Sequence, residues 1–299
     1  MSPSHDSKPN DVRSHFLQRP SIPFQRPKSA SGRARNPRRR WPVGRLLTST
    51  LLGAWGLFAP LAHALAPPPA YAERGMVVTA QHLASEVGLR ILQQGGNAVD
   101  AAVAVGYALA VVDPCCGNIG GGGFMTLHLA DGRNIFINFR ERAPLRASRN
   151  MYLDAAGHVV PGRSTRGYLA VGVPGTVLGL DTALKDYGTL TRRQVMEPAI
   201  ALAEHGYVLT SGDVTILTGS GGHGDLDALS GPSKLFAQQP NIASIFLKGG
   251  KAFKTGDRLV QKNLARTLRL IERDGPNAFY KGPIARQIVQ ASERHGGLL

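Results

Sequence analysis

Cysteine is almost absent from this sequence. The 299 residues contain only two, Cys115 and Cys116, and the two are adjacent. A disulfide framework is excluded, and adjacency disfavours a mutual disulfide, which needs well-separated Cα atoms. We expect both side chains to fill a tight, buried turn as small residues rather than to carry redox chemistry. No cysteine or histidine spacing is that of a zinc site, so the sequence predicts no metal.

Several motifs of common catalytic folds are also missing. The run GNIGGGG at 117–123 does not place glycines at relative positions one, three and six, and it follows a helical pattern, so a dinucleotide-binding fingerprint is excluded. A phosphate-binding loop is excluded because Gly123 stands where that motif requires lysine. No serine satisfies G-x-S-x-G, and the nine histidines include no H-E-x-x-H.

Acidic residues are too few to balance the basic ones, and the formal net charge is +15. This excess is unevenly distributed. Residues 1–64 hold eleven Lys and Arg against two Asp, so they carry +9 of the total. The remaining residues are only mildly basic and their cations are scattered, which argues against binding of nucleic acid.

The basic segment leads into an uncharged run at 46–65, LLTSTLLGAWGLFAPLAHAL, followed by the small-residue sites AHA and AYA. This order is typical of a secretory signal peptide. We therefore expect a basic, disordered n-region or mis-called extension at 1–45, an h-region and cleavage region at 46–72, and a body exported to the periplasm or secreted. An uncleaved apolar run would instead anchor the chain, although no stable membrane partner is expected. Arg38–Arg40 also leaves a twin-arginine signal open.

The body, residues 73–299, begins with two helical patterns. Apolar residues at a spacing of four predict an amphipathic helix over 81–94. Residues 98–112 are apolar nearly all round, which predicts a buried helix. Asn97 can cap its start, and Asp113-Pro114 ends it.

A β-hairpin follows the glycine run. Alternating apolar residues at 124–129 and 134–139 flank Asp131-Gly132, a turn dipeptide. A short strand is expected at 76–80, loops at 140–175 and a flexible loop or lid at 211–233. Further helices are expected at 176–185, 192–205, 262–273 and 283–295. The predicted class is therefore α/β (α+β).

Arg140 directly follows the second predicted strand, in the segment FRERAP. A guanidinium held at the end of a strand has the fork geometry to bind a carboxylate through two hydrogen bonds. The competing interpretation is an exposed ion pair with Glu141 or another neighbour, which would contribute little. The local pattern alone favours the ion pair.

Several segments together resemble one enzyme family. They are 75–81, GGNAVDAAVA at 95–104, GNIGGGGF at 117–124, FRERAP at 139–144, VPGTV at 173–177 and GPNAFYKG at 275–282. Their order and spacing are similar to those of the γ-glutamyltransferase (glutathione hydrolase) family, from about Gly75 to Leu299. The body is thus identified as part of the large subunit of such an enzyme.

The resemblance implies the fold of an N-terminal nucleophile hydrolase, an αββα sandwich that this chain holds incompletely. It also implies a precursor that cleaves itself into a large and a small subunit, with no cofactor. The new N-terminal threonine of the small subunit attacks the γ-carbonyl of a substrate such as glutathione, with its own amine as base. By the same resemblance Arg140 binds the α-carboxylate of the γ-glutamyl group, while no role is assigned to Arg142.

No threonine in this sequence matches the family's nucleophile, and neither Thr176 nor Thr191 has a reason to become N-terminal. We therefore expect no catalytic residue in this chain, its partner small subunit to be missing, and the chain alone to be inactive. The alternatives are a catalytically dead remnant, a fragment that binds amino-acid carboxylates, and a related acylase acting on β-lactam side chains. A free α-carboxylate on Arg140 argues against the acylase.

Overall fold

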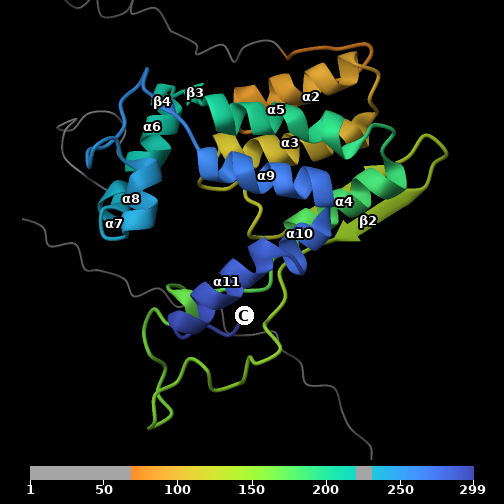
Figure 1. The fold of residues 1–299 in the computed structure, drawn as a ribbon. Coiled ribbons are helices and arrows are strands. Elements are labelled where there is room, and N and C mark those ends of the chain that lie inside the picture. The colour runs from red at the N-terminus through yellow and green to blue at the C-terminus, as the bar shows by residue number, and fades with distance from the viewer. Residues whose placement is uncertain (1–68, 220–230) are drawn as a thin grey trace, which may run out of the picture. The chain divides into compact units, whose positions relative to one another are not determined.

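Four helices pack side by side in the computed structural model (Figure 1). They are α2 (His82–Gln93), α3 (Ala98–Val112), α5 (Arg192–His205) and α9 (Lys262–Asp274), and they contact one another in that order. The structure describes residues 69–219 and 231–299. From Ala70 to Leu299 they form one compact unit.

Helix α3 lies at the centre of this packing. Val103, Ala104, Ala108 and Val111 on it are completely buried, and α2 and α5 lie against it. Alanine and valine side chains are short, so the neighbouring helix backbones can approach closely. The buried helix predicted at 98–112 is confirmed with these bounds.

A buried carboxylate holds the start of α3. Asp100 is fully buried, and its oxygens accept hydrogen bonds from the backbone N–H groups of Asn97, Thr189 and Leu190 and from the Thr189 hydroxyl, at 2.7–3.2 Å. Asn97 caps the helix in return, because its side-chain oxygen accepts hydrogen bonds from the backbone N–H groups of Val99 and Asp100. Burial by itself raises the pKa of Asp100, but the hydrogen bonds outweigh burial, and the pKa of this carboxyl lies below its ordinary value. The predicted capping by Asn97 is confirmed.

The predicted hairpin is also confirmed. Strands β1 (Phe124–His128) and β2 (Asn134–Asn138) pair antiparallel, with Phe124 opposite Asn138 and His128 opposite Asn134. Alternate residues of β1 and β2 are half-buried, among them Met125, Leu127 and Ile137, which pack against the core. The opposite face is exposed, and there the rings of Phe124 and Phe136 stack with their centroids 5.7 Å apart.

The remaining elements lie to the left of and below the four packed helices in Figure 1. Helix α4 packs against both α3 and β2, α10 joins α9 to α11, and β3 and β4 form a second antiparallel pair. Their bounds are η2 (Tyr168–Ala170), α4 (Thr176–Tyr187), β3 (Tyr207–Val208), α6 (Ser211–Thr218), α7 (Gly231–Phe236), α8 (Pro240–Phe246), β4 (Arg258–Leu259), α10 (Pro276–Tyr280) and α11 (Pro283–Arg294). The mixed helix-and-strand class is confirmed, and in the described ranges both sheets have two strands.

Two expectations about local structure were wrong. Residues 76–80 form no strand, because no partner strand pairs with them within the described part of the chain; Val77 lies against Gly88 of α2 instead. The expected loop at 211–233 contains helix α6 and the start of α7. Thr210 and Asp213 form a reciprocal capping box that starts α6, and this T-x-x-D signal was readable in the sequence.

Part of the sequence lies outside the described residues. The predicted n-region at 1–45 and uncharged run at 46–65 both lie there, as do residues 220–230 of the expected loop. Within the described ranges, no helix has the length and apolar character needed to cross a bilayer.

Replacing Asp100 tests the anchoring of α3. Asp100→Ala removes a buried acceptor of several hydrogen bonds, and we expect the free energy of unfolding to fall by about 2–4 kcal/mol. Urea denaturation followed by far-ultraviolet circular dichroism measures this. The exposed Asp131→Ala is the matched control, expected to change stability by less than about 0.5 kcal/mol. Equal effects of the two substitutions would contradict the assigned role.

Acidification tests the same carboxylate without deleting it. The pKa of Asp100 is lower in the folded than in the unfolded chain, so the unfolded chain binds more protons and stability rises with pH. Its contribution is fully present above the unfolded value, about 3.9, and is lost as pH falls through the folded pKa. The stability advantage of the wild-type chain over Asp100→Asn should therefore shrink as pH falls from 6 towards 3, an interval set by that unfolded value. A constant difference would contradict the lowered pKa.

Candidate functional site

The glycine run is attached to the N-terminus of α4. The carbonyl oxygen of Gly121 accepts hydrogen bonds from the backbone N–H groups of Gly175 (2.6 Å) and Thr176 (3.1 Å). Asn118 reinforces the attachment, because its Oδ1 accepts from the Thr176 hydroxyl at 2.9 Å and from the Gly121 N–H at 2.6 Å. A backbone carbonyl is thus directed at a helix N-terminus, where N–H groups lack partners within the helix.

Phe139, at the end of β2, joins the glycine run to α4. It exchanges two backbone hydrogen bonds with Gly123, which extends the pairing of the hairpin. A Cβ on Gly175 would lie 1.9 Å from the Phe139 carbonyl oxygen, and one on Gly179 would lie 2.1 Å from the Phe139 ring. Glycine at these positions allows the end of strand β2 and helix α4 to approach closely.

The backbone around Arg140 is consequently fixed on both sides. On the preceding side lies Phe139, and on the following side Arg142 exchanges two backbone hydrogen bonds with Val173, at 3.2 and 2.7 Å. The Arg140 N–H also donates to the side chain of Asn138. Arg140 is therefore presented from a rigid segment at the end of β2.

The guanidinium of Arg140 is exposed. Its Cζ lies 6.0 Å from the centroid of the Phe124 ring, at the outer limit of a cation–π contact. The competing interpretation of Arg140 was an ion pair with Glu141 or another neighbour. Arg140 forms no ion pair with any residue in the described ranges. Five N–H donors of a permanent cation therefore remain for a ligand.

A cavity of about 430 Å³ adjoins Arg140. Its lining combines the strand-end segment 140–144 with Ala147, Met151 and Tyr152 and with the segment 170–172. Apolar side chains, one tyrosine, two arginines and one glutamate give it a mixed lining. An anionic small molecule would find its charge complement there in the arginines.

The two cysteines are exposed, so the expectation that they fill a buried turn was wrong. They lie in a turn after α3, where the N–H groups of Cys116 and Gly117 donate to the Asp113 carbonyl. Desolvation of the sulfur, followed by hydrogen bonding to Cys116 and Asp113, raises the pKa of the Cys115 thiol to about 12. Cys115 is thus a neutral thiol near pH 7 and not an activated nucleophile.

The two threonines that were not assigned as nucleophiles have local structural roles. Thr176 donates to Asn118 as described above, and Thr191 caps α5 through a capping box with Gln194.

Of the site residues predicted from the sequence, Arg140 lies at the fixed end of strand β2 and lines a cavity. Sequence reasoning did not identify the cavity wall at 147–152, because those residues carry no motif.

Comparison with known proteins shows which family this chain resembles. The family described as Gamma-glutamyltranspeptidase matches residues 84–299. The chain is 55% identical over 237 residues to a glutathione hydrolase proenzyme of Pseudomonas sp. (strain A14), covering 79% of this chain and 39% of that protein. It is 40% identical over 237 residues to an acylase ACY 1 proenzyme of Pseudomonas sp. (strain SE83), covering 77% of this chain and 40% of that protein.

Among solved structures, the gamma-glutamyltranspeptidase of Helicobacter pylori superposes with a TM-score of 0.71 and 43% identity. The superposition covers 78% of this chain and 63% of that one. The chain therefore spans about two-fifths of the length of the curated relatives it matches.

Two glycines of the run test whether it packs closely against the end of strand β2. A Cβ on Gly122 would lie 2.6 Å from the Phe139 carbonyl oxygen and 2.7 Å from the Glu141 nitrogen, whereas one on Gly120 would meet nothing within 4 Å. We expect Gly122→Ala to lower the free energy of unfolding by about 1–3 kcal/mol and Gly120→Ala to change it by less than about 0.5 kcal/mol. Urea denaturation of the two variants measures both, and equal stabilities would refute the close packing.

Proposed function

The chain belongs to the gamma-glutamyltranspeptidase family, and from this membership we propose that it contributes the substrate-binding part of an enzyme that transfers or hydrolyses γ-glutamyl groups. Glutathione is the representative substrate. The observation that carries the proposal is the Arg140 guanidinium, which pairs with no carboxylate in the described ranges and lies beside a cavity on a backbone fixed on both sides.

Arg140 binds the α-carboxylate of the γ-glutamyl group in this proposal. A guanidinium and a carboxylate can form two parallel hydrogen bonds, which fix the orientation of the ligand as well as its position. Because Arg140 forms no ion pair with another described residue, substrate binding does not first have to break one. The hydrogen bonds that fix residues 139–142 limit the loss of backbone entropy on binding.

The chemical step belongs to a threonine outside this sequence. Its hydroxyl attacks the γ-carbonyl, the γ-amide bond breaks, and the amine leaves with a proton. Water or an amino acid then takes the glutamyl group from the acyl-enzyme. The proposal includes a second subunit that carries this threonine and an αββα sandwich in which the β1–β2 hairpin takes part. Its support is the similarity to proteins named as proenzymes and to the Helicobacter pylori structure.

A second candidate is an acylase that acts on β-lactam side chains. The 40% identity to an acylase proenzyme favours it. The higher identity to a glutathione hydrolase proenzyme favours γ-glutamyl chemistry. The exposed Arg140 favours it as well, because a guanidinium is a suitable partner for a free α-carboxylate. The two candidates differ in which acyl group is hydrolysed faster.

We also propose that the body is exported. The support is the order of a basic segment, an uncharged run at 46–65 and small-residue sites. In a cell with two membranes the product would reside in the periplasm.

Arg140 can be tested in a chimaera in which residues 75–299 replace the matching part of the Pseudomonas sp. (strain A14) proenzyme. We expect Arg140→Ala to raise the KM for γ-glutamyl-p-nitroanilide by roughly ten- to a hundredfold, because a charged hydrogen-bond partner is lost. Arg140→Lys should recover part of the loss, since it keeps the charge without the fork. Arg133→Ala, at the turn end of the hairpin, is the matched control and should leave KM unchanged.

A substrate analogue tests whether Arg140 acts through the α-carboxylate. The analogue 4-aminobutyryl-p-nitroanilide lacks the α-carboxylate, so Arg140→Ala should scarcely affect its turnover. Equal losses on both substrates would show that Arg140 does not act through the carboxylate. Faster hydrolysis of a β-lactam acyl side chain than of γ-glutamyl-p-nitroanilide would favour the acylase.

Export can be tested by N-terminal sequencing of the protein from fractionated cells. We expect a periplasmic product whose N-terminus lies just after one of the small-residue sites, Ala62–Ala64 or Ala70–Ala72. Recovery from the cytoplasm with an N-terminus at Met1 would contradict the proposal.

A further inference from the structure

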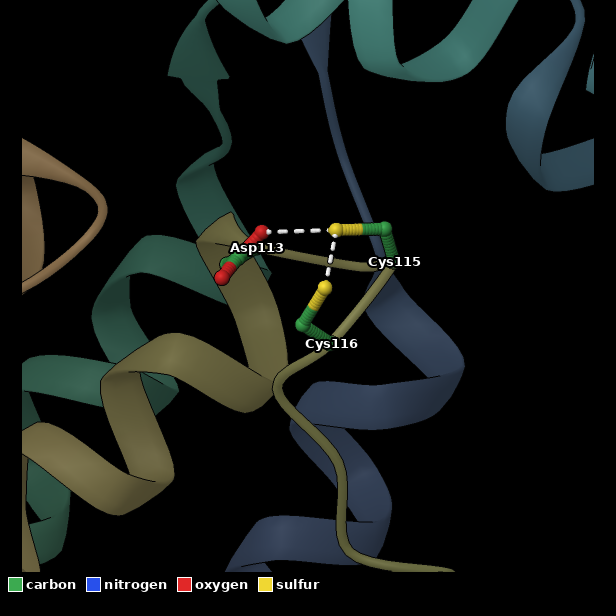
Figure 2. Close-up of side chains that lie close together, drawn as sticks. All are labelled: Asp113, Cys115 and Cys116. Atoms are coloured by element: carbon green, nitrogen blue, oxygen red, sulfur yellow. Dashed lines mark hydrogen bonds between the residues drawn. The ribbon is translucent and has the colours of Figure 1, made fainter. Parts of the chain in front are cut away.

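Three metal-ligating groups gather where α3 ends (Figure 2). The Sγ of Cys115 lies 3.2 Å from Oδ1 of Asp113 and 2.6 Å from Sγ of Cys116. The ligand atoms of the three residues all lie within 4.8 Å of one another, and the described part of the chain contains no other such group. The proposed γ-glutamyl chemistry uses none of them.

The turn after α3 directs both thiols to the same place. Neighbouring side chains in extended backbone diverge, but here the Asp113 carbonyl accepts from two successive N–H groups and closes the turn. Gly117 brings the chain back onto the helix, since a Cβ there would lie 2.1 Å from the Leu109 carbonyl oxygen. The backbone turn therefore brings the two cysteines together at the end of α3.

Long-range hydrogen bonds hold the C-terminus of α3, which directly precedes this cluster. The Tyr207 hydroxyl donates to the Val112 carbonyl at 3.3 Å, and Gln261 Nε2 donates to the Val111 carbonyl at 2.7 Å. Asp113 itself is buried and ends the 15-residue helix. The carbonyl end of a helix carries partial negative charge, so the helix end and the Asp113 carboxylate both attract a cation.

We propose that Asp113, Cys115 and Cys116 bind a thiophilic divalent cation, of which Zn²⁺ is the representative. Two thiolates and one carboxylate are ligands that zinc accepts, whereas Mg²⁺ and Ca²⁺ require oxygen ligands throughout. Binding forms two metal–sulfur bonds and releases two thiol protons to the solvent, with no electron transfer. Water occupies the fourth position, because the cysteines are exposed.

The geometry fits this ion after a small adjustment. Zn–S bonds of about 2.3 Å in a tetrahedral site separate two sulfurs by about 3.8 Å. The present separation is 2.6 Å, and rotation of two exposed side chains can supply the difference. The carboxylate oxygen is already within reach of the same ion.

Cobalt(II) provides a direct probe in the full 299-residue chain. Co²⁺ bound to thiolates gives a charge-transfer band in the near ultraviolet. The sequence contains only these two cysteines, so such a band reports this site alone. Under anaerobic, reducing conditions we expect the band to saturate at one Co²⁺ per monomeric chain and to disappear when Zn²⁺ displaces the cobalt.

Variants then identify the ligands. Cys115→Ser and Cys116→Ser should each weaken binding by more than the roughly 10- to 100-fold typical of losing an outer-shell partner, because each removes a direct ligand. Asp113→Asn should keep the band but weaken binding at least about tenfold. Asp131→Asn, an exposed aspartate in the hairpin turn, is the control and should bind as the wild type does. Circular dichroism confirms that each variant is folded.

Three results would overturn the proposal. The first is no charge-transfer band although two free thiols per chain are titrated. The second is saturation at one Co²⁺ per two chains with formation of a dimer. The third is unchanged affinity in Asp113→Asn.

Discussion

The hydrogen bonds between the Gly121 carbonyl and the first N–H groups of α4 hold the glycine run against the N-terminus of that helix. They join the segment that leaves the buried helix α3 to the segment that enters α4. Phe139 fills the remaining space between them, so the end of strand β2 is held in the same contact. The position of Arg140 depends on this junction, because Arg140 is the next residue along the chain after Phe139.

Helix α3 supplies the fixed point on which the junction rests. Its N-terminus is anchored through the buried Asp100 to Thr189 and Leu190. Its C-terminus is anchored through its last carbonyls to Tyr207 and Gln261. Both ends of one buried helix thus receive hydrogen bonds from residues about 90 or more positions away. Because α3 is held at both ends, the thiol cluster and the glycine run that follow it in sequence start from a fixed position.

Much of this arrangement could be predicted from local sequence signals. The bounds of α3 followed from Asn97 and Asp113-Pro114, and the hairpin followed from alternation around Asp131-Gly132. The segment 76–80 was mistaken for a strand because a strand requires a partner, which a short apolar run cannot reveal. Helix α6 was missed although Thr210 and Asp213 form a capping box, since the glycines that follow suggested a loop.

The site itself was predictable only in part. Arg140 was identified by its place in FRERAP, but the absence of an ion pair between it and any carboxylate of residues 69–219 and 231–299 depends on how the chain folds. The cavity wall at 147–152 comes from a loop without a motif. The facing thiols depend on how the backbone turns over the Leu109 carbonyl, and adjacency in sequence suggested burial instead.

The central claim is that Arg140 binds the α-carboxylate of a γ-glutamyl group. A crystal structure of the assembled enzyme with a bound γ-glutamyl ligand tests it most directly. We predict that the α-carboxylate accepts two hydrogen bonds from the Arg140 guanidinium, each within about 2.7–2.9 Å. An α-carboxylate bound by other residues, with the Arg140 guanidinium beyond hydrogen-bond distance, would contradict the claim.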